Sequence, residues 1–240
     1  MQARALRAAV ALTVALAMAP LAIAAQSTPA PVPAASEMPG TDPSLPSDVY
    51  ASSRSRVPLI RRDQITDDLG KKLFDLANAD ATSLVGMQGP GGISLYSPKY
   101  DDAQRPLNRF LRFSTGIDRK LIETAILVSA RETNQPFEWA AHEKAARTEG
   151  VSDATIDTIR YRRPTTGLDP KEAAIVSLGR EAIGKHKVSP ATFATAQKLF
   201  GTEQLIDLVA VMGDYLMTGL LLTTFDQQLP AGQTSALPIP

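Results

Sequence analysis

The sequence predicts an all-α protein of about seven to eight helices, and two observations support this prediction. First, almost every segment after Pro58 repeats its apolar residues at helical rather than strand spacing. Second, residues that favour helix ends flank these segments: Asp118 and Asp169 precede two of them, and Gly150 follows a third. The chain contains no cysteine, so core packing rather than disulfide bonds must stabilise the fold.

The first 25 residues have the composition of a secretory signal peptide. Arg4 and Arg7 precede an apolar run at residues 8–19, and small residues follow at Ala22 and Ala24. The run is shorter than the roughly 20 apolar residues that cross a bilayer. We therefore expect a periplasmic or secreted protein, with cleavage near Ala24 and no stable membrane anchor afterwards.

Composition divides the rest of the chain into three parts. Residues 26–56 are rich in Pro, Ala and Ser, which predicts a disordered tether. Residues 57–230 form the predicted helical domain, which is long enough to bury a core, and residues 231–240 are expected to be a disordered tail. The arginines near the first boundary, Arg54, Arg56, Arg61 and Arg62, favour a solvated domain edge over a binding patch.

The charge balance excludes one class of function. The chain has 25 basic and 25 acidic residues, for a formal net charge of zero, and no basic stripe. Proteins that bind nucleic acids need such a stripe, so we expect no nucleic-acid partner.

The first part of the domain is expected to hold two helices and a loop. Thr66 is predicted to cap a helix whose apolar face is Leu69, Leu73 and Leu76. The glycines and prolines of residues 86–100 predict an irregular loop without a helix start. A short helix is expected around residues 107–114.

Four longer helices are expected after this region. Asp118 is predicted to cap the first, and Pro136 opens the second. Asp169 and Glu172 suggest an N-cap and a capping-box acid for the third. Ser189 and Gly201 are expected to bracket the fourth.

The last predicted helix runs from Thr202 towards Gln227 and is the most apolar segment of the domain. Asp207, Asp214 and two glycines argue against a membrane span, because a carboxylate in hydrocarbon is costly. A helix that is apolar on most of its circumference is usually buried, either in the core or between subunits. We expect a subunit contact to bury part of it.

Two segments resemble each other. Residues 123–132 (ETAILVSARE) and residues 172–181 (EAAIVSLGRE) both begin with Glu and end in Arg-Glu. Two similar helical hairpins that pack together would explain this likeness, and the shared constraints of amphipathic helices would explain it equally well. When residues 123–132 are aligned with residues 172–181, Lys187 aligns with Glu138 and Ala191 with His142.

Glu138 and His142 are the main candidates for chemistry. They are four residues apart, so on a helix their side chains lie on one face, and a carboxyl group beside an imidazole can exchange protons. Such pairs are more often solvated ion pairs on a helix surface. The apolar neighbours Phe137 and Trp139 favour partial burial, which would raise the pKa of Glu138 while a charged His142 would lower it.

Other polar residues admit both structural and functional interpretations. Glu123 can be a helix-start carboxylate, and Arg131 can pair with Glu132 or Glu143 or else bind an anion. The hydroxyl group of Tyr215 must find a partner if it is buried, either in the core or in a pocket. His186 is most simply a solvated cation near a helix end.

The sequence resembles the carboxymuconolactone decarboxylase and alkylhydroperoxidase D-like superfamily. The resemblance runs from about Val57 to Pro230. The segments that carry it are LNRFLRF at 107–113, ETAILVSARETNQPFEWAAHEKAARTEGVS at 123–152, VSPATFATAQKLFG at 188–201 and VMGDYLMTGLLLTTF at 211–225. The resemblance implies an all-helical domain of the alkylhydroperoxidase D-like type. It also implies assembly as a homotrimer or homohexamer, with sites near subunit boundaries.

The alkylhydroperoxidase branch carries a glutamate, a Cys-x-x-Cys motif and a histidine. On this chain those positions fall on Glu123, on Gln135 and Glu138, and on His142. Neither Gln nor Glu can form a disulfide, so peroxide reduction through a thiolate is excluded.

The decarboxylase branch implies a cofactor-independent lyase that acts on a small, anionic cyclic or lactone substrate. We predict that His142, Glu138 and Glu123 are catalytic, that Arg131, Trp139 and Tyr215 contact the substrate, and that no metal or cofactor is used. The alternatives are a non-catalytic periplasmic helical oligomer that binds a small ligand or partner, and an isomerase or hydrolase that acts on a lactone.

Overall fold

The computed structural model describes residues 38–79 and 86–239. The predicted signal peptide and residues 26–37 of the predicted tether lie outside this part of the chain. The described residues form the following helices: α1 (Asp68–Asn78), α2 (Pro90–Ser94), α3 (Pro98–Phe113), α4 (Arg119–Glu132), α5 (Pro136–Thr148), α6 (Asp153–Arg160), α7 (Pro170–Gly179) and α8 (Pro190–Thr224). A 3₁₀ turn at Arg62–Gln64 precedes α1, and a π-helical turn at Arg180–Gly184 continues α7.

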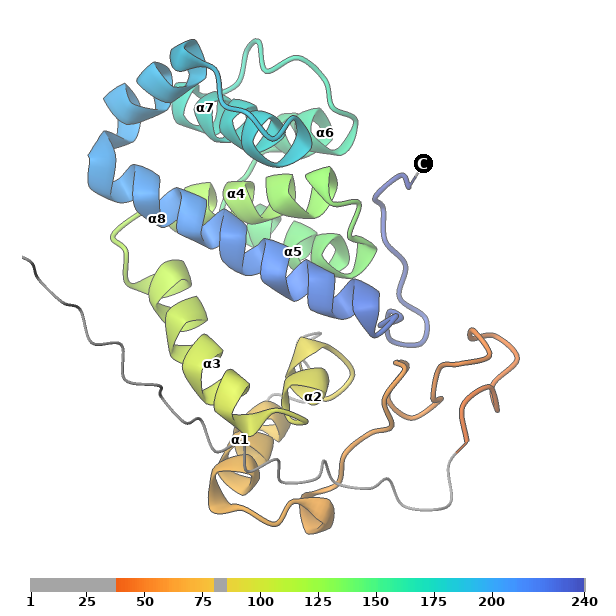
Figure 1. Cartoon of the computed structure of the whole chain (residues 1–240). Coiled ribbons are helices and arrows are strands. Elements are labelled where there is room, and N and C mark those ends of the chain that lie inside the picture. Colours follow the sequence, from red (N-terminus) through yellow and green to blue (C-terminus); the bar gives the residue numbers. More distant parts are fainter. Residues whose placement is uncertain (1–37, 80–85, 240) are drawn as a thin grey trace, which may run out of the picture. The chain divides into compact units, whose positions relative to one another are not determined.

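The prediction of an all-α fold is confirmed, since the described residues contain no strand beyond an isolated bridge between Tyr50 and Ser55. Helix α4 lies at the centre of the domain and packs against α5, α7 and α8 (Figure 1). Its residues 121–131 are buried on every side of the helix, as expected for a helix enclosed by its neighbours. This central position fixes the side chains that α4 contributes to the site.

The expected boundary at Gly201 is confirmed as a kink inside α8. Gly201 has φ 72° and ψ 174°, a backbone conformation that glycine adopts readily and that separates two helical parts. Among the described residues, α8 is the one helix that is long and apolar enough to cross a membrane by length and composition, and 44% of its apolar window is buried inside the protein. The buried side chains of α8 include Leu208, Val211 and Met212, which belong to the main core cluster.

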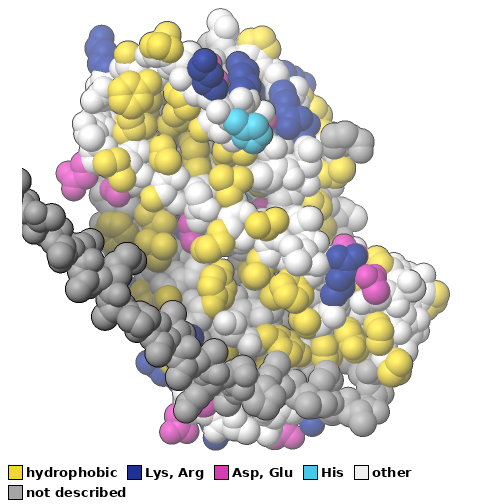
Figure 2. All heavy atoms as spheres, viewed as in Figure 1, with side chains coloured by type: hydrophobic (Ala, Val, Ile, Leu, Met, Phe, Trp, Pro, Cys, Tyr) yellow, Lys and Arg dark blue, Asp and Glu magenta, His cyan; other side chains and the backbone are white. Residues whose placement is uncertain are grey.

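The face of α8 away from the core remains apolar. Ile206, Val209, Met217 and Leu220 are exposed at helical spacing. Figure 2 shows apolar side chains gathered over the course of α8 on the viewed face. The expected subunit contact would cover this stripe.

Three local predictions need correction. Asp67, not Thr66, caps α1 by accepting a hydrogen bond from the Gly70 N–H at 2.7 Å, and Leu76 points to solvent. Residues 86–100 are not a continuous loop, because Pro90 starts the short helix α2. Glu172 is not a capping-box acid: Asp169 alone caps α7, while the Glu172 carboxylate is buried and accepts a hydrogen bond from the Thr155 hydroxyl.

The expectation of a disordered tether does not hold for residues 38–56. Val49 is buried, and the Ser55 hydroxyl donates to the Phe225 carbonyl at 3.1 Å. The Gln228 N–H donates to the Arg54 carbonyl at 2.8 Å, so this segment is fixed to the chain that follows α8. In the predicted tail, Leu237 is also buried, within the cluster that contains Trp139. Few buried apolar side chains are needed to hold residues 38–56, because backbone hydrogen bonds to the chain after α8 also hold them in place.

The two similar segments, residues 123–132 and 172–181, form α4 and α7 with the first residues of the π-helical turn, and the two helices pack against each other. Contact is close at Gly179, where an added Cβ would lie 2.3 Å from Val128 Cγ1. Both initial glutamates, Glu123 and Glu172, are buried. Lys187 and Ala191, which correspond to Glu138 and His142 when the two segments are aligned, are both exposed. The second segment therefore has no counterpart of the Glu138 and His142 pair.

Candidate active site

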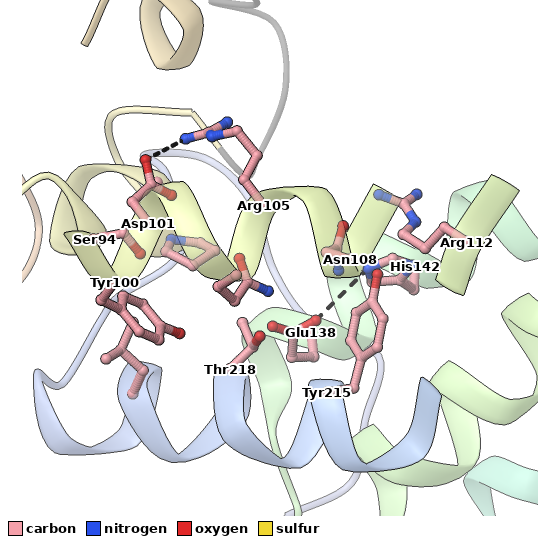
Figure 3. Close-up of a pocket in the computed structure, with 14 residues that line it drawn as sticks. Ser94, Tyr100, Asp101, Arg105, Asn108, Arg112, Glu138, His142, Tyr215 and Thr218 are labelled. Atoms are coloured by element: carbon pink, nitrogen blue, oxygen red, sulfur yellow. Dashed lines mark hydrogen bonds and ion pairs between the residues drawn. The ribbon is translucent and has the colours of Figure 1, made fainter. Parts of the chain in front are cut away.

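A pocket of about 130 Å³ lies between α2, α3, α5 and α8 (Figure 3). The polar side chains that line it are Ser94, Tyr100, Asp101, Gln104, Arg105, Asn108, Arg112, Glu138, His142, Tyr215 and Thr218. Pro90, Gly91 and Leu221 complete the wall. Because the polar groups come from four helices, only the packed fold brings them together.

His142 is held from behind by Glu123. Its Nδ1 lies 2.7 Å from Glu123 Oε2, and both side chains are buried. The other oxygen of Glu123 accepts a hydrogen bond from Arg119 at 2.6 Å. Burial acts to raise the pKa of Glu123, but His142, Arg112 and Arg119 outweigh it, and the pKa is lowered. Glu123 is therefore an ionised acceptor, and it fixes the Nδ1–H tautomer of the imidazole.

Glu138 faces the other nitrogen of His142. Its Oε2 lies 3.7 Å from His142 Nε2, one helical turn away on α5. Burial raises the pKa of Glu138 to about 8, and the negative charges of Asp214 and Glu123 act in the same direction, whereas Arg112 opposes them. Burial also lowers the pKa of His142. Near neutral pH the pair therefore consists of a protonated carboxyl and a neutral imidazole, and the carboxyl carries the transferable proton.

Tyr215 closes the pocket over the imidazole. Its ring stands edge-on to His142, with the ring centroids 4.8 Å apart and an interplanar angle of 90°. Burial raises the pKa of Tyr215, so its hydroxyl remains protonated. The phenol can therefore orient a ligand by hydrogen bonding but cannot serve as a base.

Asp214 of α8 is buried and binds two amides of α3. Gln104 Nε2 donates to its Oδ1 at 3.1 Å, and Asn108 Nδ2 donates to its Oδ2 at 2.7 Å. We call Asp214, Gln104 and Asn108 the amide cluster. Among the described residues, no cation pairs with Asp214, so the two amides stabilise its charge.

Two arginines of α3 line the same pocket. Arg105 pairs with Asp101, whose Oδ2 lies 2.7 Å from its Nη2. Arg112 lies only loosely against Glu123, with its Nη2 3.8 Å from Oε1, an oxygen that already binds Arg119. The Nε atoms of both arginines are buried without a hydrogen-bond partner in the described part of the chain.

The structure brings together four of the six predicted site residues. Glu138, His142 and Tyr215 line the pocket, and Glu123 lies directly behind His142. Trp139 does not line the pocket: it is buried in a separate core cluster, and its Nε1–H donates to Glu143 at 2.7 Å. Arg131 does not line it either, because its guanidinium binds Asn134 at the end of α4. The helical register of α4 and α5 turns both side chains away from the pocket.

None of the pocket residues on α3 was among the predicted site residues. Asp101, Gln104, Arg105, Asn108 and Arg112 recur at spacings of three, four and seven residues, so they share one face of the helix. This polar stripe is a signal in the sequence. It is easily taken for an ordinary solvated face, and only the packing of α3 against α8 shows otherwise.

Gln135 takes a structural role at the first position where the resemblance places a cysteine. Its side-chain oxygen accepts a hydrogen bond from the Phe137 N–H at 3.1 Å, and its amide group donates to the Gly219 carbonyl of α8. It thus caps α5 and ties this helix to α8. Of the two cysteine positions, only the one at Glu138 faces the pocket.

Within the described ranges, no group of three or more His, Cys, Asp or Glu side chains has the geometry to hold a metal ion. The polar groups of the pocket can hold and transfer protons, orient an anion through arginine, and donate or accept hydrogen bonds. This set of functions matches acid–base chemistry on a small molecule.

Comparison with known proteins places the fold. Residues 98–181 match the model of the carboxymuconolactone decarboxylase family. The search of curated proteins finds no match. One similar solved structure is a protein of unknown function from Agrobacterium tumefaciens, proposed to be the antioxidant defence protein AhpD. It is 18% identical with a TM-score of 0.53, over 57% of this chain and 95% of that chain.

A second similar structure is the alkylhydroperoxidase AhpD core of an uncharacterised peroxidase-related protein from Ralstonia eutropha JMP134. It is 15% identical with a TM-score of 0.60, over 74% of this chain and 93% of that chain. At these identities the two structures establish a common helical fold.

Proposed function

We propose that this chain is a cofactor-independent lyase of the decarboxylase type, because residues 98–181 match the carboxymuconolactone decarboxylase family and the helical fold is shared with two AhpD-like structures. Its substrate would be a small acidic cyclic compound or lactone. The observation that carries the proposal is the juxtaposition of the Glu138 carboxyl and the His142 imidazole, 3.7 Å apart, in a pocket of about 130 Å³.

The reaction needs one proton at one carbon. Loss of CO₂ from a carboxylate that is conjugated to a carbonyl group breaks a C–C bond, and the electron pair remains as a dienolate. Glu138, or His142 after it receives the proton of Glu138, would protonate the dienolate carbon, and solvent would restore the proton. The pKa of about 8 keeps Glu138 protonated at neutral pH, as a general acid requires.

Glu123 supports this chemistry without contacting the substrate. It lies behind His142 and is held by Arg119, so its charge orients the imidazole and would stabilise an imidazolium formed during the reaction. We therefore assign Glu123 as a positioning residue.

The pocket volume limits the size of the substrate. An engineered apolar cavity of about 150 Å³ holds one benzene molecule. The pocket of about 130 Å³ is close to this size. A single ring with its polar groups is compatible with this volume.

Peroxide reduction by a thiol is not available to this chain, because it contains no cysteine. The names of the two solved structures therefore suggest no thiol chemistry for it.

We further propose export to the periplasm or beyond through residues 1–25, and a homotrimer or homohexamer in solution. The exposed apolar stripe of Ile206, Val209, Met217 and Leu220 on α8 supports the assembly, because large apolar surfaces usually mark contacts.

Turnover of a panel of carboxylated lactones and unsaturated cyclic acids tests the proposal, with ultraviolet absorbance and CO₂ release as readouts. The chain has two histidines, so His186→Asn at the exposed site is a matched control for His142→Asn. We expect turnover in the wild type and the control, and a loss of about 10²- to 10⁴-fold in His142→Asn with the fold intact. Turnover that survives His142→Asn would remove this residue from the mechanism.

One observation favours a second candidate function, a non-catalytic oligomer that binds a small ligand or partner. The buried hydrogen bond between Glu123 and His142 joins α4 to α5, so the pair can serve stability alone. No turnover on any compound, together with a large loss of stability in His142→Asn, would favour this candidate.

A further inference from the structure

The two ends of the pocket along α3 differ in charge. Arg112 lies one helical turn, about 5.4 Å, from Asn108, and Gln104 lies one further turn away. Arg112 therefore lies at the end near Glu138 and His142, Asp101 lies at the other end, and the amide cluster lies between them (Figure 3). A ligand bound at this end meets Arg112 and the amide cluster.

Arg112 is the arginine without an acid of its own. The nearest carboxylate oxygen to the Arg112 guanidinium is Glu123 Oε1, at 3.8 Å from Nη2. Arg119 already binds that oxygen. The Arg119 Nε also lies 3.7 Å from Glu149 Oε1. The Arg112 Nε is buried and has no hydrogen-bond partner within the described residues. A ligand carboxylate at this end would satisfy the guanidinium and its buried donor.

Arg105 differs from Arg112 in one respect. Its buried Nε also has no partner among the described residues, but its charge is balanced by Asp101 at 2.7 Å. The pair is therefore close to neutral and offers little attraction to a second anion.

The amide cluster offers acceptors. Gln104 and Asn108 each direct an amide hydrogen to Asp214, and Asn108 also makes a side-chain hydrogen bond with the Tyr215 hydroxyl. Apart from that bond, no hydrogen bond from the described residues reaches their carbonyl oxygens. Both amides line the pocket, with the Asp214 carboxylate behind them. A hydroxyl group can donate to these oxygens, whereas a carboxylate cannot and would be repelled by Asp214.

We infer that the pocket selects a ring-sized monocarboxylate with a hydroxyl group opposite its carboxylate, and that it disfavours a dicarboxylate of the same size. Arg112 binds the carboxylate, and the amide cluster accepts the hydrogen bond of the hydroxyl. This inference deepens the proposed function and rests on the same site, but it concerns binding and so can be tested without turnover.

Isothermal titration calorimetry of the wild-type protein with benzoate, 4-hydroxybenzoate and terephthalate tests the selection. We expect 4-hydroxybenzoate to bind about 3- to 10-fold more tightly than benzoate, from one added hydrogen bond. Terephthalate should bind at least about 10-fold more weakly than 4-hydroxybenzoate. Equal or tighter binding of terephthalate would overturn the inference, as would the absence of binding by all three probes.

Variants test the two contacts. Arg112→Gln should weaken 4-hydroxybenzoate binding by about 30-fold or more, whereas Arg109→Gln, at an exposed position of the same helix, should leave it unchanged. Asp214→Asn should reduce the discrimination against terephthalate. Unchanged binding in Arg112→Gln, or unchanged discrimination in Asp214→Asn, would overturn the corresponding assignment.

The wild-type series needs no variant to fold, so it tests the selection by itself. If no lactone is turned over but the expected order of binding is observed, the inference stands and the proposed lyase reaction fails. If turnover is found and the order is reversed, the lyase reaction stands and the inference fails.

Discussion

Replacement of Glu138 by Gln should make the protein more stable at alkaline pH. Burial raises the pKa of this carboxyl from 4.5 to about 8, so the folded protein keeps a proton that the unfolded chain releases above pH 4.5. Stability must then fall as the pH rises through the window from about 4.5 to 8, because the folded state binds more protons there. Gln has nearly the same shape as a protonated Glu and does not titrate.

The pKa difference sets the magnitude. A difference of about 3.5 pKa units corresponds to about 5 kcal/mol of unfolding free energy above pH 8. The pKa of His142 is lowered by burial, so its contribution is lost as the pH falls below its ordinary value of 6.5. That contribution is present in both proteins and largely cancels in their difference.

Urea unfolding at pH 5, 7 and 9, followed by circular dichroism, measures this difference. We expect Glu138→Gln to match the wild type within about 1 kcal/mol at pH 5 and to exceed it by several kcal/mol at pH 9. Asp102→Asn, at an exposed position of α3, controls for the general loss of a negative charge. A difference between Glu138→Gln and the wild type that stays constant from pH 5 to pH 9 would refute the burial of a protonated carboxyl.

Four further predictions concern the rest of the domain. Glu123→Gln should cost about 3–5 kcal/mol in chemical unfolding, because it leaves Arg119 without its buried partner, and should also reduce turnover. Trp139→Ala should cost about 3–5 kcal/mol while ligand affinity in calorimetry stays unchanged, since this residue packs outside the pocket. Gly179→Ala should lower the melting temperature, because its Cβ would lie 2.3 Å from a Val128 side-chain carbon, at a cost of about 1–3 kcal/mol. Leu220→Glu on the exposed stripe should reduce the sedimentation coefficient to that of a monomer without loss of helicity; an unchanged coefficient would exclude this stripe as the subunit contact.

Much of the fold was predictable because local chemistry specifies helices. Asp118, Asp169 and Ser189 cap helices in the structure as they were expected to, and Gly201 interrupts α8. The pairing of Glu138 with His142 was also predictable, since a separation of four residues places two side chains on one helical face. These features depend on residues that are neighbours in the sequence.

The errors have a different origin. Trp139 and Arg131 are close in sequence to His142 and Glu132, but the rotation of α4 and α5 directs them into a core cluster and to a helix end. Residues 38–56 have few large apolar side chains, yet hydrogen bonds to the chain after α8 fix them. Neither outcome depends on local sequence.

The sequence by itself determined the helices, their ends and the carboxyl–imidazole pair, because these follow from spacings of three or four residues. The tertiary structure decided which polar groups share a pocket. Arg112 of α3 and Asp214 of α8 lie about 100 residues apart in the chain, and only the packing of the two helices brings them to one site with His142 and Glu138 of α5. Burial in that packing also shifts the pKa of Glu138 to about 8, which turns an ordinary helix pair into a candidate acid.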